Sequence, residues 1–360
     1  MPENKLPELI ELERLIEKAV QLAPASAHLE VRSECAVSMD GRQLPVYSLA
    51  LGNPSPDVPA VGFFGGIHGL ERIGTQVLLT FLNGLLARLR WDRLLHQQLE
   101  NVRLVFMPLI NPGGMWQSTR CNPQGVDLMR NAPVDAIDRV PFLLGGQRIS
   151  PRLPWFRGAA GAPMEAENQA LCKVVRQELL NRQFSIALDC HSGFGLRDRI
   201  WFPHAHTLRP IEHLPDICAL EDLFSQTYPN HNYVFEPQSL QYLTHGDIWD
   251  YLYLTSAENT GQVFLPLTLE MGSWLWVKKN PRQLFSLQGI FNPVARHRLQ
   301  RVLRSHTVWL DFLARAACGH QHWLPQGEDR DIHQQRAYAR WYPSAQQREP
   351  TVFPQGMYRR

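Results

Sequence analysis

AVGFFGGIHGLE, residues 60–71, begins as an almost unbroken apolar run and ends in a glycine-rich turn that carries a histidine and a glutamate. A run that is apolar at consecutive positions is typical of a strand covered on both faces, as in a parallel sheet between helices. Three further runs share this character: VRLVFMPLI (102–110), FSIALDC (184–190) and PLTLEMG (266–272). Apolar residues at helical spacing lie between the runs, at 73–90 and 165–182. The alternation predicts an α/β fold with helices flanking a central sheet.

The two ends of the chain depart from this central pattern. Residues 9–20 carry apolar side chains at helical spacing, and residues 28–51 resemble two strands joined by a turn at Asp40-Gly41. After a last predicted helix at 293–317 the sequence becomes polar and rich in Pro, Gln and Arg, which is typical of extended or partly disordered chain. We therefore expect three parts: an N-terminal helix-hairpin extension at 1–50, a large α/β domain at 51–317 and a polar C-terminal tail at 318–360.

Composition limits the classes of function. The chain has 36 basic and 34 acidic residues, so its formal charge of +2 argues against a general nucleic-acid or membrane-surface binder. Glutamates interrupt the first 20 residues, where a signal peptide would need an apolar stretch, and no later apolar run nears the roughly 18 residues of a membrane span. The six cysteines are scattered and form no C-x-x-C pair, which fits a reducing compartment. We expect a cytoplasmic protein.

Polar residues able to bind a metal stand at the ends of two of the apolar runs. His68 and Glu71 follow the first run, and His191 follows the third in Asp189-Cys190-His191-Ser192-Gly193. Ligands gather at the carboxyl ends of strands in open α/β sheets, and two histidines with one carboxylate leave a zinc ion one open position. The alternative is that His68 and Glu71 form a surface pair at a helix start and that His191 is a hydrogen-bonded histidine at a strand end.

Glu270 is the candidate general base. It stands near the end of the fourth apolar run, where burial would raise the pKa of its carboxyl group toward the range useful for proton transfer. The alternative is a carboxylate that emerges from the sheet into solvent.

Several stretches together resemble the zinc carboxypeptidase family. INPGGMWQSTRCNPQGVDLMRN (110–131) is similar to the family segment N-P-D-G, R-x-N and G-V-D-L-N-R-N, and residues 68–71 match the H-x-x-E zinc loop. Four more stretches follow in the family's order: FRGAAGAPMEAENQAL (156–171), the third-ligand strand D-x-H-S-G (189–193), the tyrosine loop QYLTHGD (241–247) and the glutamate strand T-L-E-M-G (268–272). The motifs extend from about residue 60 to about residue 275, and residues 1–45 and 318–360 fall outside them.

The resemblance implies a three-layer α/β/α fold with a mixed, twisted sheet of the zinc-carboxypeptidase type, and one zinc ion per chain. His68, Glu71 and His191 would bind the zinc ion. Glu270 would activate water and pass its proton to the leaving amine. Arg120 would polarise the scissile carbonyl and stabilise the oxyanion.

The same resemblance implies four further roles. Arg130 would bind the terminal carboxylate of the substrate in a bidentate contact. Tyr242 would lie over the bound substrate, although a half-buried core aromatic is the alternative. Trp249 matches a position that shapes the side-chain pocket, and its bulk disfavours basic C-terminal residues. Asp127 would accept a hydrogen bond from the free ring nitrogen of His68.

Three departures from the family pattern concern substrate contacts and packing more than the metal. Met129 stands where the family usually has an asparagine before the carboxylate-binding arginine, so one of two expected carboxylate contacts is missing. Gly113 replaces the aspartate of N-P-D-G, and Leu70 replaces an arginine often found before the zinc-binding glutamate.

The implied function is zinc-dependent hydrolysis of an amide bond next to a free carboxylate, as in a metallocarboxypeptidase that removes C-terminal residues from peptides. One alternative is a zinc amidase or deacylase acting on N-acyl amino acids or cell-wall peptides, as in the aspartoacylase and succinylglutamate desuccinylase group. A second is an inactive metal-binding protein that holds peptides. The expected partner is a peptide or acylated amino-acid substrate, with neither a nucleic acid nor a membrane.

Overall fold

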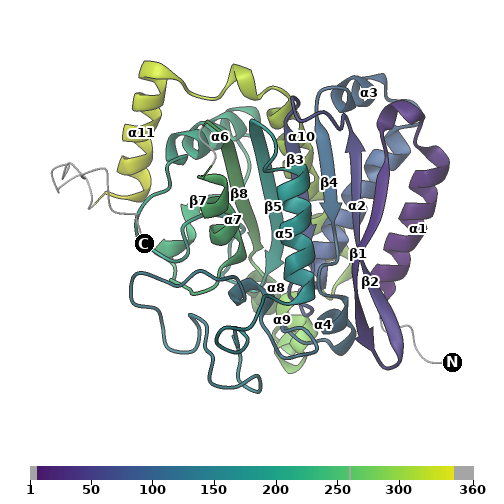
Figure 1. Cartoon of the computed structure of the whole chain (residues 1–360), viewed down its shortest axis with the longest axis vertical. Coiled ribbons are helices and arrows are strands. Elements are labelled where there is room, and N and C mark those ends of the chain that lie inside the picture. Colours follow the sequence, from purple (N-terminus) through teal and green to yellow (C-terminus); the bar gives the residue numbers. More distant parts are fainter. Residues whose placement is uncertain (1–5, 259–260, 344–360) are drawn as a thin grey trace.

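The computed structural model describes residues 6–258 and 261–343, and their strands and helices are as follows (Figure 1). The strands are β1 (Glu30–Met39), β2 (Arg42–Gly52), β3 (Ala60–Gly65), β4 (Arg103–Met107), β5 (Phe184–Ser192), β6 (Arg199–Phe202), β7 (Val234–Pro237) and β8 (Val263–Met271). The α-helices are α1 (Pro7–Leu22), α2 (Arg72–Arg88), α3 (Arg93–Leu99), α4 (Pro112–Gln117), α5 (Ala166–Glu178), α6 (Leu214–Thr227), α7 (Ile248–Ser256), α8 (Trp274–Lys279), α9 (Leu287–Phe291), α10 (Arg296–Cys318) and α11 (Gly327–Trp341). Short 3-10 turns are η1 (Ala25–Ala27), η2 (Leu128–Arg130), η3 (Gln238–Leu240), η4 (Pro281–Phe285) and η5 (His320–His322).

The described residues form one mixed sheet of eight strands in the order β1-β2-β4-β3-β5-β8-β6-β7. The four apolar runs became its central strands β4, β3, β5 and β8, which are all parallel to one another. Strands β1, β2 and β6 run antiparallel to their inner neighbours. Because the central strands are parallel, their carboxyl ends meet at one edge of the sheet and place the loops that follow them side by side.

Helices cover both faces of the sheet, so the predicted α/β/α architecture is confirmed. Helices α2 and α10 pack against β3 and β5 on one face, and α1 packs on α2. Helices α5 and α7 lie on the opposite face, in front of the sheet in Figure 1. The apolar strands are thus shielded on both sides, as their unbroken apolar sequence requires.

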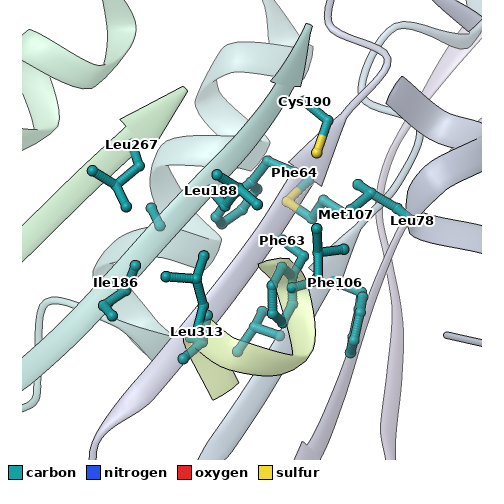
Figure 2. Close-up of a cluster of buried hydrophobic side chains, with 14 of the residues drawn as sticks. Phe63, Phe64, Leu78, Phe106, Met107, Ile186, Leu188, Cys190, Leu267 and Leu313 are labelled. Atoms are coloured by element: carbon teal, nitrogen blue, oxygen red, sulfur yellow. The ribbon is translucent and has the colours of Figure 1, made fainter. Parts of the chain in front are cut away.

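The centre of the core shows why β3 contains two consecutive phenylalanines (Figure 2). Successive side chains of a strand point to opposite faces. Phe63 stacks on Phe106 of β4 at 5.1 Å between ring centroids, whereas Phe64 contacts Trp249 of α7 at 5.0 Å. Both phenylalanines are fully buried, and each contributes about 2–3 kcal/mol of hydrophobic free energy.

The predicted N-terminal extension belongs to the same sheet as the rest. The turn at Asp40 and Gly41 forms where expected, with positive φ values of 49° and 74°. Strand β2 then pairs antiparallel with β4, so the boundary placed at residue 50 does not separate two structural units. The main-chain hydrogen bonds between β2 and β4 decide this continuity, and no local sequence pattern reveals them.

The C-terminal tail was expected to be extended or disordered, but residues 327–341 form helix α11, so this expectation is wrong for them. The helix packs on α6, where Arg330 donates to both carboxylate oxygens of buried Asp216 at 2.8 Å. Trp341 anchors its end, because the buried indole N–H donates to the Phe235 carbonyl at 2.7 Å. The last part of the predicted tail, residues 344–360, lies outside the described residues.

Two observations concern the cysteines and the helices. All six cysteines carry free thiols. Within the described residues, every helix is too short or too polar to cross a membrane. The cytoplasmic location itself stays a prediction.

Candidate active site

The loop after β3 brings His68 and Glu71 to the end of the sheet. The chain leaves β3 through Gly66, whose φ of 67° is rarely adopted by residues with a side chain. Gly69 then passes so close to α4 that a Cβ atom would lie 2.0 Å from the Gly114 backbone. The Glu71 N–H donates to the His68 carbonyl at 3.0 Å, and this turn buries both side chains before α2 begins.

His191 approaches the same point from β5. Its Nδ1 atom lies 3.1 Å from Oε2 of Glu71, and the rings of His68 and His191 have centroids 5.0 Å apart. One potential ligand atom of each of the three residues lies within 4.8 Å of the others. The structure therefore assembles the three predicted ligands into one buried group.

The chemistry of this group fits a zinc ion. Within residues 6–258 and 261–343, the buried Nδ1 of His68 has no hydrogen-bond partner. Burial lowers the pKa of His68 well below its usual value, which keeps the imidazole neutral as a ligand must be. At His191 burial opposes a charge, but Asp189 and Glu71 outweigh it and raise the pKa well above the usual value. The carboxylates thus favour a positive charge at this point, which a bound dication would supply.

Glu270 lies beside His191 because the two residues pair in register across β8 and β5. Its Oε1 atom accepts the Phe194 N–H at 3.0 Å, which fixes the direction of the carboxylate. Burial, followed by the nearby charge of Glu71, raises the pKa of Glu270 from 4.5 to about 8. The predicted general base is therefore buried next to His68, Glu71 and His191, which together are the metal group. The alternative of a solvated carboxylate is wrong.

Arg120 reaches the site from the loop after α4. Its Nε atom donates to Oδ2 of Asp127 at 2.9 Å, and Nη1 lies 3.4 Å from Oε1 of Glu71. The side chain is 26% exposed, so part of the guanidinium can still meet a substrate.

Asp127 does not make the hydrogen bond that was predicted for it. Its Oδ1 atom is 3.7 Å from Nδ1 of His68, which is too long for a hydrogen bond. Oδ1 instead accepts the Met129 N–H at 3.1 Å and starts the turn η2, while Oδ2 is held by Arg120. Asp127 therefore positions Arg120 and η2 directly, and His68 at most through its charge.

Arg130 is a buried guanidinium without a carboxylate partner among the described residues, and its Nε atom has no hydrogen-bond partner there. Its Cζ atom lies 6.0 Å from the ring centroid of Tyr242. A buried charge without an ion-pair partner is costly, so this position is suited to an anionic group of a ligand. Met129 beside it is buried among apolar side chains and cannot share that task.

Tyr242 and Trp249 occupy different environments. Tyr242 is half-buried beside Phe194 and Trp201, at 6.1 Å between centroids in each case, which leaves part of its ring accessible. Trp249 is 3% exposed, and its indole N–H donates to Oδ2 of Asp189 at 2.9 Å. This placement disagrees with the prediction that Trp249 shapes a substrate pocket, because the ring is enclosed by the core.

The departures at Gly113 and Leu70 have local reasons. A Cβ atom at Gly113 would lie 2.5 Å from the Pro123 ring and 2.9 Å from Val37, so an aspartate does not fit here. Leu70 is buried, an environment that suits an apolar side chain better than the charged arginine of the family pattern. Both changes adjust the packing around the metal loop and leave the ligands in place.

A mixed α/β sheet with a buried group of two histidines and one glutamate at the carboxyl ends of its parallel central strands defines a metallohydrolase type of site. The sequence model of the zinc carboxypeptidase family matches residues 15–272, and the chain belongs to this family. The match contains every predicted site residue. It also begins before β1, so residues 15–45, which the motifs left outside the resemblance, lie inside the family region.

Two curated relatives match parts of the chain. Carboxypeptidase E of Caenorhabditis elegans is 32% identical over 176 residues, which are 44% of this chain and 36% of that protein. Carboxypeptidase SOL1 of Arabidopsis thaliana is 37% identical over 75 residues, which are 21% of this chain and 15% of that protein. The chain thus spans about a third or less of the length of these relatives.

Solved structures share the fold at low sequence identity. Thrombin-activatable fibrinolysis inhibitor superposes with a TM-score of 0.64 at 16% identity, over 86% of this chain and 74% of that one. Carboxypeptidase A from Helicoverpa armigera gives 0.61 at 17% identity, over 85% and 71%. A metallo-carboxypeptidase from Burkholderia cenocepacia gives 0.51 at 14% identity, over 86% and 68%. At such identities the likeness concerns the fold.

Proposed function

We propose that the protein is a metallocarboxypeptidase that hydrolyses the amide bond next to the free carboxylate of a peptide. The observation that carries this proposal is Arg130, a buried guanidinium without a carboxylate partner among the described residues. Its charge acts on His68, and it lies over Tyr242, whose hydroxyl also senses the charge of Glu270. Arg130 would bind the terminal carboxylate of a peptide and present the last amide bond to the residues that act on it.

His68, Glu71 and His191 would hold the zinc ion, which supplies Lewis acidity and lowers the pKa of water. Glu270 would accept the proton of the attacking water as its oxygen adds to the carbonyl carbon. Arg120 would stabilise the negative charge that develops on the carbonyl oxygen. As the carbon–nitrogen bond breaks, Glu270 would give the proton to the leaving amine, and both products would leave with the bond hydrolysed.

The amidase alternative uses the same residues, because an N-acyl amino acid also has a carboxylate next to its amide bond. Because Met129 lies in the core, Arg130 is the residue of its segment that is predicted to donate hydrogen bonds to the substrate carboxylate. A small acylated substrate is compatible with such a site. A panel that contains N-acetyl amino acids and peptides of two to six residues separates the two activities. Faster cleavage of the N-acetyl amino acids would favour the amidase.

The direct test compares C-terminal acid and C-terminal amide versions of one peptide. The wild-type protein should cleave the acid much faster. Arg130→Lys keeps the charge but loses the planar guanidinium, so kcat/KM on the acid should fall about tenfold or more while the amide changes little. Equal cleavage of acid and amide by the wild-type protein would exclude recognition of a free carboxylate.

A further inference from the structure

Asp189 is a buried carboxylate for which neither the motifs nor the mechanism supplied a role. It precedes His191 by two residues in β5, so the two side chains point to the same face of the sheet. Oδ2 of Asp189 lies 2.7 Å from Nε2 of His191. An N–H on Nε2 that donates to this oxygen leaves Nδ1 of His191, the atom that faces Glu71, free to bind a metal.

The same oxygen accepts a second hydrogen bond, from the indole N–H of Trp249 at 2.9 Å. The other oxygen, Oδ1, has no hydrogen-bond partner in the part of the chain that the structure describes. Among the described residues, His191 and Trp249 are therefore the two that fix the rotation of the Asp189 carboxylate.

The position of Trp249 is itself well fixed. It lies in the first turn of α7, where Oδ1 of Asp247 accepts its main-chain N–H at 2.9 Å. Its ring packs on Phe64, which pairs with Asp189 across β3 and β5, and it is 3% exposed. The helix cap fixes the main chain of Trp249, and burial together with packing on Phe64 holds the ring with its N–H toward Asp189.

We propose that Trp249 is a positioning residue for the metal: its indole N–H orients the Asp189 carboxylate, which in turn holds His191 with Nδ1 toward the metal. The proposal rests on the zinc site of the proposed function. It replaces a role in the substrate pocket with a role in metal affinity. Partners of this kind beyond the ligands typically change metal affinity by about 10- to 100-fold.

The test measures the zinc affinity of the full-length chain by competition with a chromophoric chelator. Trp249→Phe keeps an aromatic ring on Phe64 but removes the N–H, so the apparent Kd for Zn²⁺ should rise about 10- to 100-fold. Trp341→Phe is the matched control, because it also removes a buried indole hydrogen bond, at 2.7 Å to the Phe235 carbonyl and away from the metal group. This control should bind Zn²⁺ as the wild type does.

A double-mutant cycle shows whether Trp249 acts through Asp189. Asp189→Asn should weaken Zn²⁺ binding by a similar factor, and adding Trp249→Phe to it should change the Kd by less than about twofold. If the two substitutions raise the Kd independently, so that their factors multiply in the double variant, the proposal is overturned. It is also overturned if Trp249→Phe binds Zn²⁺ as tightly as the wild type. If Trp249→Phe does not fold, wild-type affinity in Asp189→Asn alone overturns it.

The outcomes separate this inference from the proposed function. A wild-type protein that binds no zinc would contradict the proposed function itself. A wild-type protein that binds zinc, with Trp249→Phe altering substrate preference at unchanged affinity, would return Trp249 to the substrate pocket and remove the positioning role.

Discussion

At the scale of single residues, Glu270 connects the geometry of the site to its chemistry. The carboxylate is buried, receives a main-chain N–H and is paired in register with His191. Glu270→Gln conserves this shape but removes the base. We expect it to retain zinc and to lose turnover by about 10²- to 10⁴-fold. Metal analysis and kcat measured on the same preparation check both parts, and near-normal turnover with bound zinc would assign the base to another residue.

The pKa of Glu270 predicts a pH dependence. A general base acts in its ionised form, and Glu270 has a pKa raised from 4.5 to about 8 by burial and by Glu71. A zinc ion bound beside Glu71 would lower the pKa of Glu270, because its positive charge favours the ionised carboxylate. Activity should therefore be present at high pH and be lost as the pH falls, with a midpoint between 4.5 and about 8. The measurement is kcat/KM across a buffer series, with zinc content followed at each pH. A flat profile at constant zinc content would contradict the prediction.

The residues of the site were predictable to the extent that a local motif carries them. His68 and Glu71 stand three residues apart after an apolar strand, and Glu270 ends another, so the sequence places them at one sheet edge. Asp189 stands in the same D-x-H segment as His191, which was a usable signal. Its contact with Trp249 joins residues 60 positions apart, and it depends on how α7 packs on the sheet. No spacing in the sequence reports such a contact.

At the scale of secondary structure, the long apolar strands were predicted, and the short elements were not. β6 and β7 have four residues each and mix charged with apolar side chains, so they carry neither an apolar run nor a clear alternation. Helix α11 buries Ala337 and Trp341 and is held to α6 largely by arginine–carboxylate pairs, which a pattern of apolar spacing does not detect.

A buried arginine ties the N-terminal hairpin to the sheet. Arg103 of β4 lies 2.6 Å from a Glu30 oxygen and 3.2 Å from a Glu178 oxygen, and it donates to the Gly52 carbonyl at 2.8 Å. At Glu30 burial opposes ionisation, but Arg103 together with Arg32 outweighs it and lowers the pKa. The single side chain therefore joins β1, β2 and α5.

Arg103→Met should destabilise the fold by about 3 kcal/mol, because it leaves buried acceptors and the charge of Glu178 with fewer partners. The free energy of unfolding in urea measures the loss. Arg14→Met is the control, since its pair with Glu11 is exposed and should contribute little to stability. Equal effects of the two substitutions would show that Arg103 does not hold the hairpin.

At the scale of the whole molecule, the site joins distant parts of the chain. The ligands come from the β3 loop and from β5, and Glu270 comes from β8. An ion bound to all three ligands stabilises the folded chain over the unfolded one, by about 4 kcal/mol at a free concentration 1,000 times the Kd. A chelator should therefore lower Tm in the wild-type protein but leave His68→Ala unchanged. A wild-type Tm that is insensitive to chelator would show that metal and fold are not linked.

The register between β5 and β8 also limits how the gene can change. His191 and Glu270 lie side by side, near the carboxyl ends of two paired strands. A codon gained or lost inside either strand moves one residue by about 3.3 Å and turns it to the opposite face. The same event between η2 and α5, where a long irregular segment joins the two, leaves the strand register intact. Length variation is therefore tolerated in the loops around the site and excluded from the strands beneath it. New substrate preferences can arise through the loops while His191 and Glu270 keep their relative position.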